Sequence, residues 1–260
     1  MKITYYLLDA VAFYQSTDIT NFLRGPIMRD IKVNIVIPVY NEEKTIGNVL
    51  EQIEELRPRL PALQVIVVDD GSQDGTGEEV AEFPFVKYVR HEKQRGKGAA
   101  LRTAIEHCTG DIIVIQDADL EYSPFEIPRL IEPILNGRAD VVYGSRLKGR
   151  HDDMSFSHYI GNVILSLVAR LLYRSPVTDV MTGHKCLTRD AIRTIELTED
   201  GFKIEAEITA KILKNNCRFT EVPITYSKRR NGVSKIRYRD GVASMLKLFA
   251  LAISRTPGND

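Results

Sequence analysis

The sequence predicts an α/β protein with a mostly parallel central sheet and helices on both faces. Short apolar segments alternate with amphipathic segments along the first half of the chain, and parallel strands buried on both faces have this continuous apolar character. With 260 residues, 43% hydrophobic and 27% charged, the chain can bury a full core and has an ordinary globular composition. In such sheets ligands bind beyond the carboxyl ends of the strands.

The alternation of strands and helices begins at Ile31. Asn41 is expected to cap a helix whose apolar residues recur at helical spacing from Ile46 to Leu56, and a second helix is expected over residues 98–108. The expected strands cover residues 31–37, 65–68, 86–89, 112–115 and 141–143. The polar motifs described below fall at the ends of these strands.

The second half of the chain has a different pattern. Residues 159–174 carry an apolar stripe at helical spacing, residues 203–215 are expected to form another helix, and residues 218–226 are expected to be extended. A basic cluster over residues 228–239 precedes a helix over residues 241–253 that is apolar on nearly every side. The aromatic-rich residues 1–28 do not fit the pattern and are expected to form a loosely docked extension.

Charge and cysteine content exclude several classes of protein. Basic and acidic residues balance at 35 each, so no overall charge favours nucleic acid, and no such partner is expected. Cys108, Cys186 and Cys217 are widely spaced, which argues against a disulfide framework or a zinc site and fits a reducing compartment. No signal-peptide pattern is evident and no apolar run reaches about 18 residues, so a cytoplasmic protein that does not cross a membrane is expected.

The strongest chemical signal is Asp117-Ala118-Asp119, which follows the strand at residues 112–115, with Glu121 two residues further on. Two such carboxylates cannot both be buried without a counter-charge. A Mg²⁺ or Mn²⁺ ion supplies one, because it takes one or two carboxylates and keeps positions for substrate phosphates. The alternative is an acidic, solvated loop, and the position at a strand end favours the metal site.

Two further motifs follow strands. In Asp69-Asp70-Gly71 the carboxylates could accept hydrogen bonds from a nucleobase or a ribose hydroxyl, although these residue types also favour turns for local reasons. In the segment from Pro38 to Glu43, Tyr40 could flank a base and Glu42 could reach a ribose, although the same residues make a good helix start.

The segment Arg95-Gly96-Lys97-Gly98 is basic and glycine-rich at a predicted helix N-terminus. That arrangement suits a diphosphate, and a plain surface turn is the alternative. It is not a Walker loop, and no Rossmann G-x-G-x-x-G motif occurs in the chain.

In their order and spacing, five segments resemble family 2 glycosyltransferases of the GT-A fold: PVYNEE at 38–43, VVDDGSQDGT at 67–76, RGKGAAL at 95–101, QDADLEYSP at 116–124 and GSR at 144–146. Within that family the chain is similar to dolichol-phosphate mannosyl- and glucosyltransferases and their prokaryotic polyprenyl-phosphate relatives. Residues 179–185, 201–207 and 229–235 support this narrower group. The resemblance implies a catalytic domain over 29–240, with a nucleotide-binding half to residue 120 and an acceptor half beyond it, and then a C-terminal helix and tail over 241–260.

The resemblance also implies the chemistry: inverting, metal-dependent transfer of a hexose from GDP-mannose or UDP-glucose to dolichyl or polyprenyl phosphate. The metal, Mg²⁺ or Mn²⁺, would be held by Asp117 and Asp119, with Glu121 as a third ligand. Asp119 and Arg146 would be catalytic, and acceptor or donor phosphates would meet Arg146, Arg229 and Lys235. The donor would contact Pro38, Tyr40, Glu42, Val68, Asp70, Lys97, Asp117, Ala118 and Asp119. After the glycine of the 179–185 segment, relatives often have an aromatic residue where this chain has His184.

The acceptor can also be approached from the residues. An ionised phosphate attacks without a general base, whereas a hydroxyl acceptor needs one, and Glu205 is the candidate for that alternative. The apolar helices over 160–172 and 242–253, with the basic cluster between residues 228 and 239, predict peripheral binding to the cytoplasmic face of a membrane, although both helices could instead belong to the core.

The sequence leaves two alternatives from other classes: a nucleotidyltransferase that makes nucleotide sugars, and a non-catalytic nucleotide-sugar-binding module. The first would need a glycine-rich basic loop directly after the first strand, where this chain has PVYNEE. The intact acidic and basic motifs argue against the second.

Overall fold

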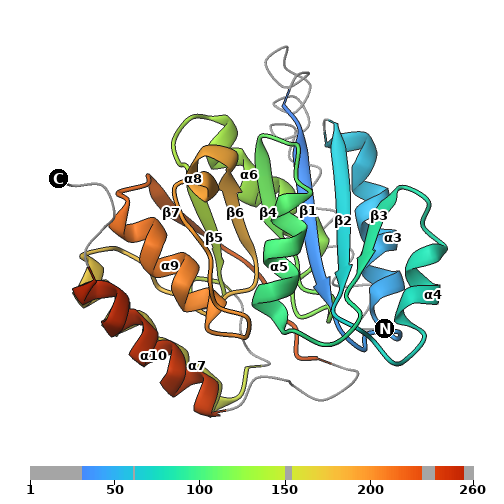
Figure 1. Ribbon diagram of the computed structural model, residues 1–260. Helices are drawn as coiled ribbons and strands as arrows, with labels where there is room; N and C mark the ends of the chain where they lie inside the picture. Colours follow the sequence, from blue (N-terminus) through green and yellow to red (C-terminus); the bar gives the residue numbers. More distant parts are fainter. Residues whose placement is uncertain (1–30, 61, 150–153, 230–237, 255–260) are drawn as a thin grey trace.

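The computed structural model describes residues 31–60, 62–149, 154–229 and 238–254. Within these residues the strands form one sheet in the order β3-β2-β1-β4-β6-β5-β7, and helices lie against both faces (Figure 1). The strands are β1 (Val33–Val39), β2 (Leu63–Asp69), β3 (Val86–Arg90), β4 (Ile112–Ile115), β5 (Val141–Ser145), β6 (Lys185–Thr188) and β7 (Phe219–Pro223). The predicted fold class is therefore confirmed. The predicted extension over residues 1–28 lies outside the described residues.

The sheet is parallel except at β6. β1 pairs in parallel with β2 and β4, β2 with β3, and β5 with β7, whereas β6 runs antiparallel between β4 and β5. All five predicted strands are present with slightly shifted ends, and β7 lies within the predicted extended segment. β6 was not predicted, because its sequence KCLT begins with a lysine and lacks the apolar run that marks the other strands.

The helices include the five predicted from periodicity and three that were not. Their bounds are α3 (Ile46–Leu56), α4 (Thr76–Ala81), α5 (Lys97–Glu106), α6 (Ile127–Leu135), α7 (Phe156–Tyr173), α8 (Arg189–Arg193), α9 (Ile204–Lys214) and α10 (Tyr238–Ile253), with 3-10 turns η2 (Arg57–Arg59) and η3 (Pro124–Glu126). α4 and α8 are too short to show a period, and α6 contains Pro128 and Pro133, which argue against a helix in sequence.

The prediction that Asn41 caps the first helix is wrong. α3 begins after Thr45, and Asn41 instead has a left-handed backbone with φ 49°. Asparagine tolerates this conformation better than most residues. The Asn41 side chain accepts a hydrogen bond from the Gln73 backbone amide at 2.8 Å, and the Asn41 amide donates to the Ser72 hydroxyl at 2.9 Å. Asn41 thus joins the loops that follow β1 and β2, which brings two of the predicted motifs together.

The core lies in two layers, one on each face of the sheet. Alternate residues of a strand serve opposite layers: Val36 of β1 packs with α5 and α9, whereas Ile35 and Ile37 pack with α3 and α6. Because both faces are covered, the strands are apolar throughout, as the sequence indicated. The layer that contains α5 and α9 also receives α7 and α10.

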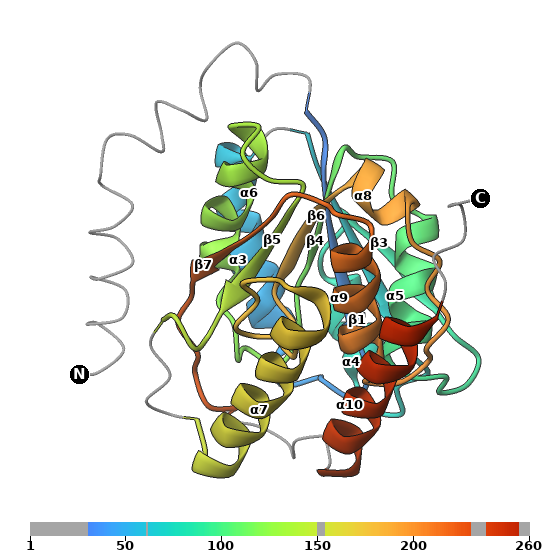
Figure 2. The same cartoon turned by 90° about the vertical axis from the view of Figure 1, so that its left-hand side faces the viewer.

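α7 and α10 lie side by side on the outer side of α9 (Figures 1 and 2). The Tyr173 hydroxyl of α7 donates to the Leu248 carbonyl of α10 at 2.6 Å. Both helices also expose large apolar side chains: Phe156, Ile160, Ile164, Leu167 and Leu171 on α7, and Tyr238, Val242, Leu246, Phe249 and Ile253 on α10. Among the described residues, no helix has the length and apolar character needed to span a bilayer.

Candidate active site

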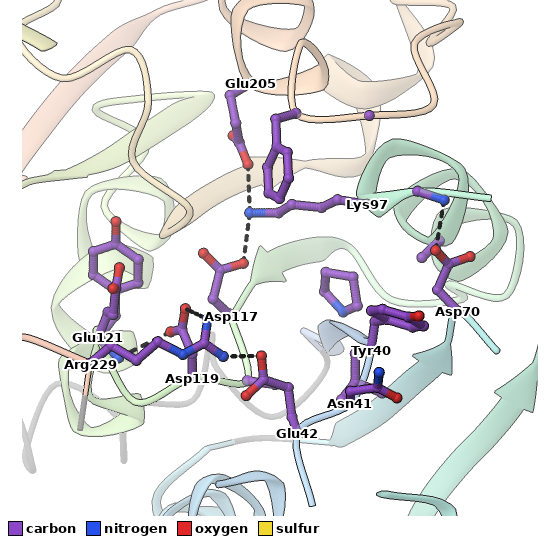
Figure 3. Close-up of a pocket in the computed structure, with 18 of the residues that line it drawn as sticks. Tyr40, Asn41, Glu42, Asp70, Lys97, Asp117, Asp119, Glu121, Glu205 and Arg229 are labelled. Atoms are coloured by element: carbon purple, nitrogen blue, oxygen red, sulfur yellow. Dashed lines mark hydrogen bonds and ion pairs between the residues drawn. The ribbon is translucent and has the colours of Figure 1, made fainter. Parts of the chain in front are cut away.

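The carboxyl ends of β1, β2 and β4 open into a cavity of about 630 Å³ (Figure 3). Its walls include most of the predicted site residues, namely Pro38, Tyr40, Glu42, Asp70, Lys97, Asp117, Ala118, Asp119, Glu121, Arg146 and Arg229. Val68 is fully buried in the core and is not among the described residues that line the cavity. Lys235 lies outside the described residues. Tertiary folding thus brings five separate sequence motifs to one cavity.

Lys97 lines the cavity, and its predicted contact with the donor stays a prediction. Its ammonium nitrogen lies 2.7 Å from Asp117 Oδ1 and 2.8 Å from Glu205 Oε1, so it bridges the acidic motif and α9 (Figure 3). Burial opposes the charge on Lys97, but these two carboxylates outweigh burial and raise its pKa above the ordinary value. Lys97 is therefore a permanent positive charge beside Asp117.

The other carboxylate oxygen of Glu205, Oε2, pairs with a second lysine. Lys185, which is fully buried, donates to Glu205 Oε2 and to the Thr182 carbonyl, and its nitrogen lies 4.7 Å from the centre of the Tyr143 ring. Burial lowers the pKa of Lys185, while the Glu205 carboxylate acts in the opposite direction. Both carboxylate oxygens of Glu205 are thus occupied by lysine side chains, Oε1 by Lys97 and Oε2 by Lys185.

Asp119 and Glu121 form the other acidic part of the cavity. Asp119 Oδ1 accepts a hydrogen bond from the Glu121 amide at 3.1 Å, and Asp119 Oδ2 lies 3.8 Å from Arg229, which also pairs with Glu42. Burial, followed by repulsion from neighbouring carboxylates, raises the pKa of Asp119 to about 6 and that of Glu121 to about 7. Among the described residues, six acidic side chains line the cavity against three basic ones, Lys97, Arg146 and Arg229.

Burial of the two aspartates does not by itself require a metal, contrary to the argument from sequence. Lys97 and Arg229 supply part of the counter-charge that was attributed to an ion. Still, the ligand chemistry suits Mg²⁺ or Mn²⁺, which typically takes one or two carboxylates and completes its shell with substrate phosphates. The described residues hold no group of three or more side chains placed to bind a metal ion, and the assignment of Asp117, Asp119 and Glu121 as ligands stays a prediction.

Gly183 makes room for Asp117. A Cβ atom at Gly183 would overlap the Asp117 carboxylate, which rests directly against the glycine backbone. Only glycine lacks that atom, so this residue sets how closely the segment before β6 can approach the acidic motif. The sequence contained the glycine within the 179–185 segment but gave no indication of its neighbour.

Asp70 lines the cavity but also fastens the basic loop. Its carboxylate lies 2.7 Å from the His91 ring nitrogen and accepts hydrogen bonds from the backbone amides of Arg95 at 2.9 Å and Gly96 at 2.6 Å. The contact with a nucleoside therefore remains a prediction, whereas the structure shows Asp70 holding the loop that presents Lys97.

The sequence suits a diphosphate site at the N-terminus of α5, with a plain surface turn as the alternative. In the structure the amides of Gly98 and Ala99 donate to the Asp200 carbonyl, at 2.6 and 3.2 Å. These amides are thus used within the protein, and the α5 residues that line the cavity are Lys97 and Ala100.

Arg146 forms a bidentate pair with Asp179: its Nε lies 2.8 Å from Oδ2 and its Nη2 lies 2.7 Å from Oδ1. The guanidinium carbon is 5.9 Å from the ring centres of both Tyr122 and Tyr226. Arg146 still lines the cavity, as predicted. Its partner Asp179 lies in the 179–185 segment, together with Gly183 and Lys185. The sequence of this segment resembles that of relatives but predicted no role for these three residues.

Comparison with known proteins agrees with this architecture. A mostly parallel sheet with an acidic motif at the end of β4 is the GT-A arrangement of glycosyltransferases. Residues 34–195 match the family model described as "Glycosyl transferase family 2". The chain therefore belongs to that family and is a glycosyltransferase.

Relatives and solved structures show which glycosyltransferases this chain is similar to. The chain is 32% identical to a dolichol-phosphate mannosyltransferase of Pyrococcus furiosus over 215 residues, which cover 80% of this chain and 60% of that longer protein. It is also 32% identical to an undecaprenyl-phosphate mannosyltransferase of Micrococcus luteus over 219 residues, 79% of this chain and 88% of that one. Glucosyl-3-phosphoglycerate synthase from Mycobacterium tuberculosis, solved with Mn²⁺ and UDP-glucose, shares the fold with a TM-score of 0.72 at 22% identity, over 93% of this chain and 84% of that one.

His184 gives a prediction about stability. Both of its ring nitrogens are buried without a hydrogen-bond partner among the described residues, its ring centre is 5.8 Å from that of Tyr122, and burial lowers its pKa to about 3. Below about pH 6.5 the unfolded chain binds a proton that the folded chain excludes, so this histidine costs roughly 1.4 kcal/mol of stability per pH unit until pH approaches the folded pKa. We expect His184→Phe to be more stable than the wild type, by a margin that grows from pH 7 to pH 5.

Chemical denaturation at several pH values measures this margin. His158→Gln, at an exposed histidine, is the control and should leave the pH dependence of stability unchanged. A His184→Phe margin that is the same at pH 7 and pH 5 would show that His184 titrates normally in the folded protein.

Proposed function

We propose that this glycosyltransferase moves a hexose from a nucleotide sugar, GDP-mannose or UDP-glucose, to dolichyl or polyprenyl phosphate, with inversion and with help from Mg²⁺ or Mn²⁺. The observation that carries the proposal is the pairing of Glu205 with two lysines. A hydroxyl acceptor needs a carboxylate base, and the candidate for that base is ion-paired with both Lys97 and Lys185. A phosphate acceptor is already ionised and needs no base. The names of the relatives at about 30% identity support the same acceptor class.

The donor would occupy the cavity with its nucleoside near Pro38, Tyr40 and Asp70. Its diphosphate would lie toward Asp117 and Asp119, which would hold the divalent ion. A bound ion there neutralises charge that develops on the departing nucleoside diphosphate. A protein that shares the fold was solved with Mn²⁺ and UDP-glucose, which supports the kinds of ligand proposed here.

Arginine and lysine side chains would place the acceptor. Arg146 would bind the acceptor phosphate, and Arg229, which already contacts the Glu42 and Asp119 carboxylates, would exchange part of that contact for a phosphate when substrates enter. Lys235 keeps its predicted role at the phosphates. These cations would offset repulsion between the attacking phosphate and the donor diphosphate, and attack from the side opposite the leaving group gives inversion.

A panel of radiolabelled nucleotide sugars tests the proposal. Each would be incubated with a short polyprenyl phosphate and Mg²⁺ or Mn²⁺, and in parallel with a soluble oligosaccharide acceptor. The expected result is label that enters organic solvent only when the lipid phosphate is present. The anomeric carbon of the labelled product should have the inverted configuration. Label that reaches only the oligosaccharide would replace this proposal with the hydroxyl-acceptor alternative.

The acceptor lipid also explains the apolar face of α7 and α10. Two adjacent helices with large exposed apolar side chains suit insertion into a membrane interface, with the protein on the cytoplasmic face. Leu171 and Leu246 are among the most exposed, at 73% and 65%. We expect the protein to sediment with anionic liposomes and Leu171→Glu/Leu246→Glu to remain in the supernatant, because each charge would have to enter the apolar layer.

The control for this experiment is Asn48→Glu/Asn136→Glu. It adds the same charge at exposed positions of α3 and the end of α6, on the opposite face of the sheet. The control should sediment like the wild type. Equal sedimentation of all three proteins would remove the membrane role of these helices.

A further inference from the structure

The Arg146 guanidinium is held in place by the buried carboxylate of Asp179. It follows directly after β5, and Asp179 lies in the segment between α7 and β6. Besides the bidentate side-chain contact, the Arg146 backbone amide donates to Asp179 Oδ2 at 2.9 Å. Asp179 is fully buried, and the Arg146 side chain is only 12% exposed. The pairing uses Nε and Nη2, which fixes the plane of the guanidinium.

Asp179 is itself fixed by two other elements. The Asn162 side chain of α7 donates to Asp179 Oδ1 at 2.6 Å, and the Asp179 backbone amide donates to Glu221 of β7 at 3.2 Å. Glu221 also accepts from the Thr178 amide at 2.7 Å and pairs with Lys148 at 2.9 Å. Burial alone would raise the pKa of Asp179, but Arg146 and Asn162 more than offset it and lower that pKa. Asp179 is therefore an ionised group built into the fold.

We propose that Asp179 is a positioning residue for acceptor recognition, which holds the Arg146 guanidinium in the orientation that receives the acceptor phosphate. The inference rests on the proposed function, in which Arg146 binds that phosphate. It gives a role to the 179–185 segment: Asp179 orients the acceptor-side arginine, Gly183 of the same segment rests against Asp117 of the predicted metal site, and Lys185 pairs with Glu205. One segment thus sets the relative position of the two halves of the site.

Two effects of Asp179 oppose each other. Its negative charge reduces the attraction of Arg146 for a phosphate, whereas its bidentate contact removes the rotational freedom of a long side chain and aligns it before binding. Orientation is expected to prevail. Arg146 has little exposed surface, so without this carboxylate it would lose the contact that holds it between the Tyr122 and Tyr226 rings.

The test is steady-state kinetics of hexose transfer with Asp179→Asn, which keeps the size of the side chain and removes its charge. The KM for polyprenyl phosphate should rise roughly tenfold or more, as for loss of a charge-assisted hydrogen bond, while the KM for the donor stays within about twofold. Asp179→Glu, which restores a carboxylate, should recover part of the loss. Asn162→Ala should change the acceptor KM in the same direction by a smaller factor.

The protein contains a matched control. Asp140, at the opposite end of β5, makes the same set of contacts with Arg218: the backbone amide at 2.9 Å, Nε at 3.0 Å and Nη2 at 2.6 Å. Asp140→Asn therefore removes a bidentate pair of the same geometry, more exposed than that of Asp179 and outside the cavity. It should leave both KM values unchanged.

A double-mutant cycle separates orientation from general structural support. Lysine cannot make the bidentate contact, so in an Arg146→Lys background Asp179→Asn should add little to the acceptor KM. If the effects of Arg146→Lys and Asp179→Asn on the acceptor KM multiply instead, the inference is wrong while the proposed function stands. The same holds if Asp179→Asn alone lowers the acceptor KM or leaves it unchanged. If the wild-type enzyme transfers no sugar to polyprenyl phosphate, the proposed function fails and the inference fails with it.

Discussion

Asp119→Ala should reduce hexose transfer by roughly a thousandfold or more, because it removes a carboxylate that would hold the divalent ion against the leaving diphosphate. The variant should fold normally. Asp119 lies at the cavity wall, and the one hydrogen bond described for its carboxylate is to the Glu121 amide. Removing it also relieves repulsion that raises the pKa of Glu121. Transfer kinetics measure the loss, and thermal unfolding checks the fold.

Two further measurements make this prediction decisive. Asp119→Ala should bind Mn²⁺ much more weakly than the wild type in the presence of a nucleoside diphosphate. The electron paramagnetic resonance signal of free Mn²⁺ measures this binding. Asp140→Ala, which removes a carboxylate at the other end of the sheet, should bind Mn²⁺ and transfer sugar like the wild type. Full transfer activity after exhaustive treatment with a chelator would contradict the metal assignment.

Lys97→Met should have opposite effects on two properties. Transfer should fall about a hundredfold, since a fixed positive charge beside the diphosphate is lost. Mn²⁺ binding without nucleotide should become tighter, because the ammonium group that lies 2.7 Å from Asp117 no longer competes for that carboxylate. Glu205 would keep Lys185 as its partner, whereas Asp117 would lose its ion pair with Lys97.

Lys211→Met is the matched control for Lys97. Lys211 pairs at 2.8 Å with the buried carboxylate of Glu207, which also accepts hydrogen bonds from the 198–199 backbone, and it lies outside the cavity. Its loss should affect stability but neither Mn²⁺ affinity nor transfer. Mn²⁺ binding by Lys97→Met that is no tighter than in the wild type would show that Lys97 does not compete with the ion.

Local patterns predicted the sheet well where strands and helices had their usual signatures. Every apolar run that was expected to be a strand is one, because parallel strands buried on both faces need apolar residues throughout. The prediction failed at β6, where Lys185 is buried by an ion pair with Glu205 from a helix 20 residues further along the chain. Nothing local to residues 185–188 indicates that partner.

The same limit applies to the site. The acidic motif, the arginine after β5 and the basic loop were all predicted to face one cavity, and they do, because carboxyl ends of parallel strands meet at one edge of a sheet. Their ionic partners were not predicted. Asp70 and Asp200 hold the loop that carries Lys97, and those contacts join residues far apart in sequence.

The sequence by itself determined the α/β class, the family and the set of charged groups at the cavity, since each depends on residue type and order along the chain. The tertiary structure decided which charges neutralise which. It placed Lys97 on Asp117, closed Glu205 between two lysines and set Asp179 behind Arg146. Ion pairing depends on distances of a few ångströms between side chains from different elements, and such distances exist only once the sheet and its helices have packed.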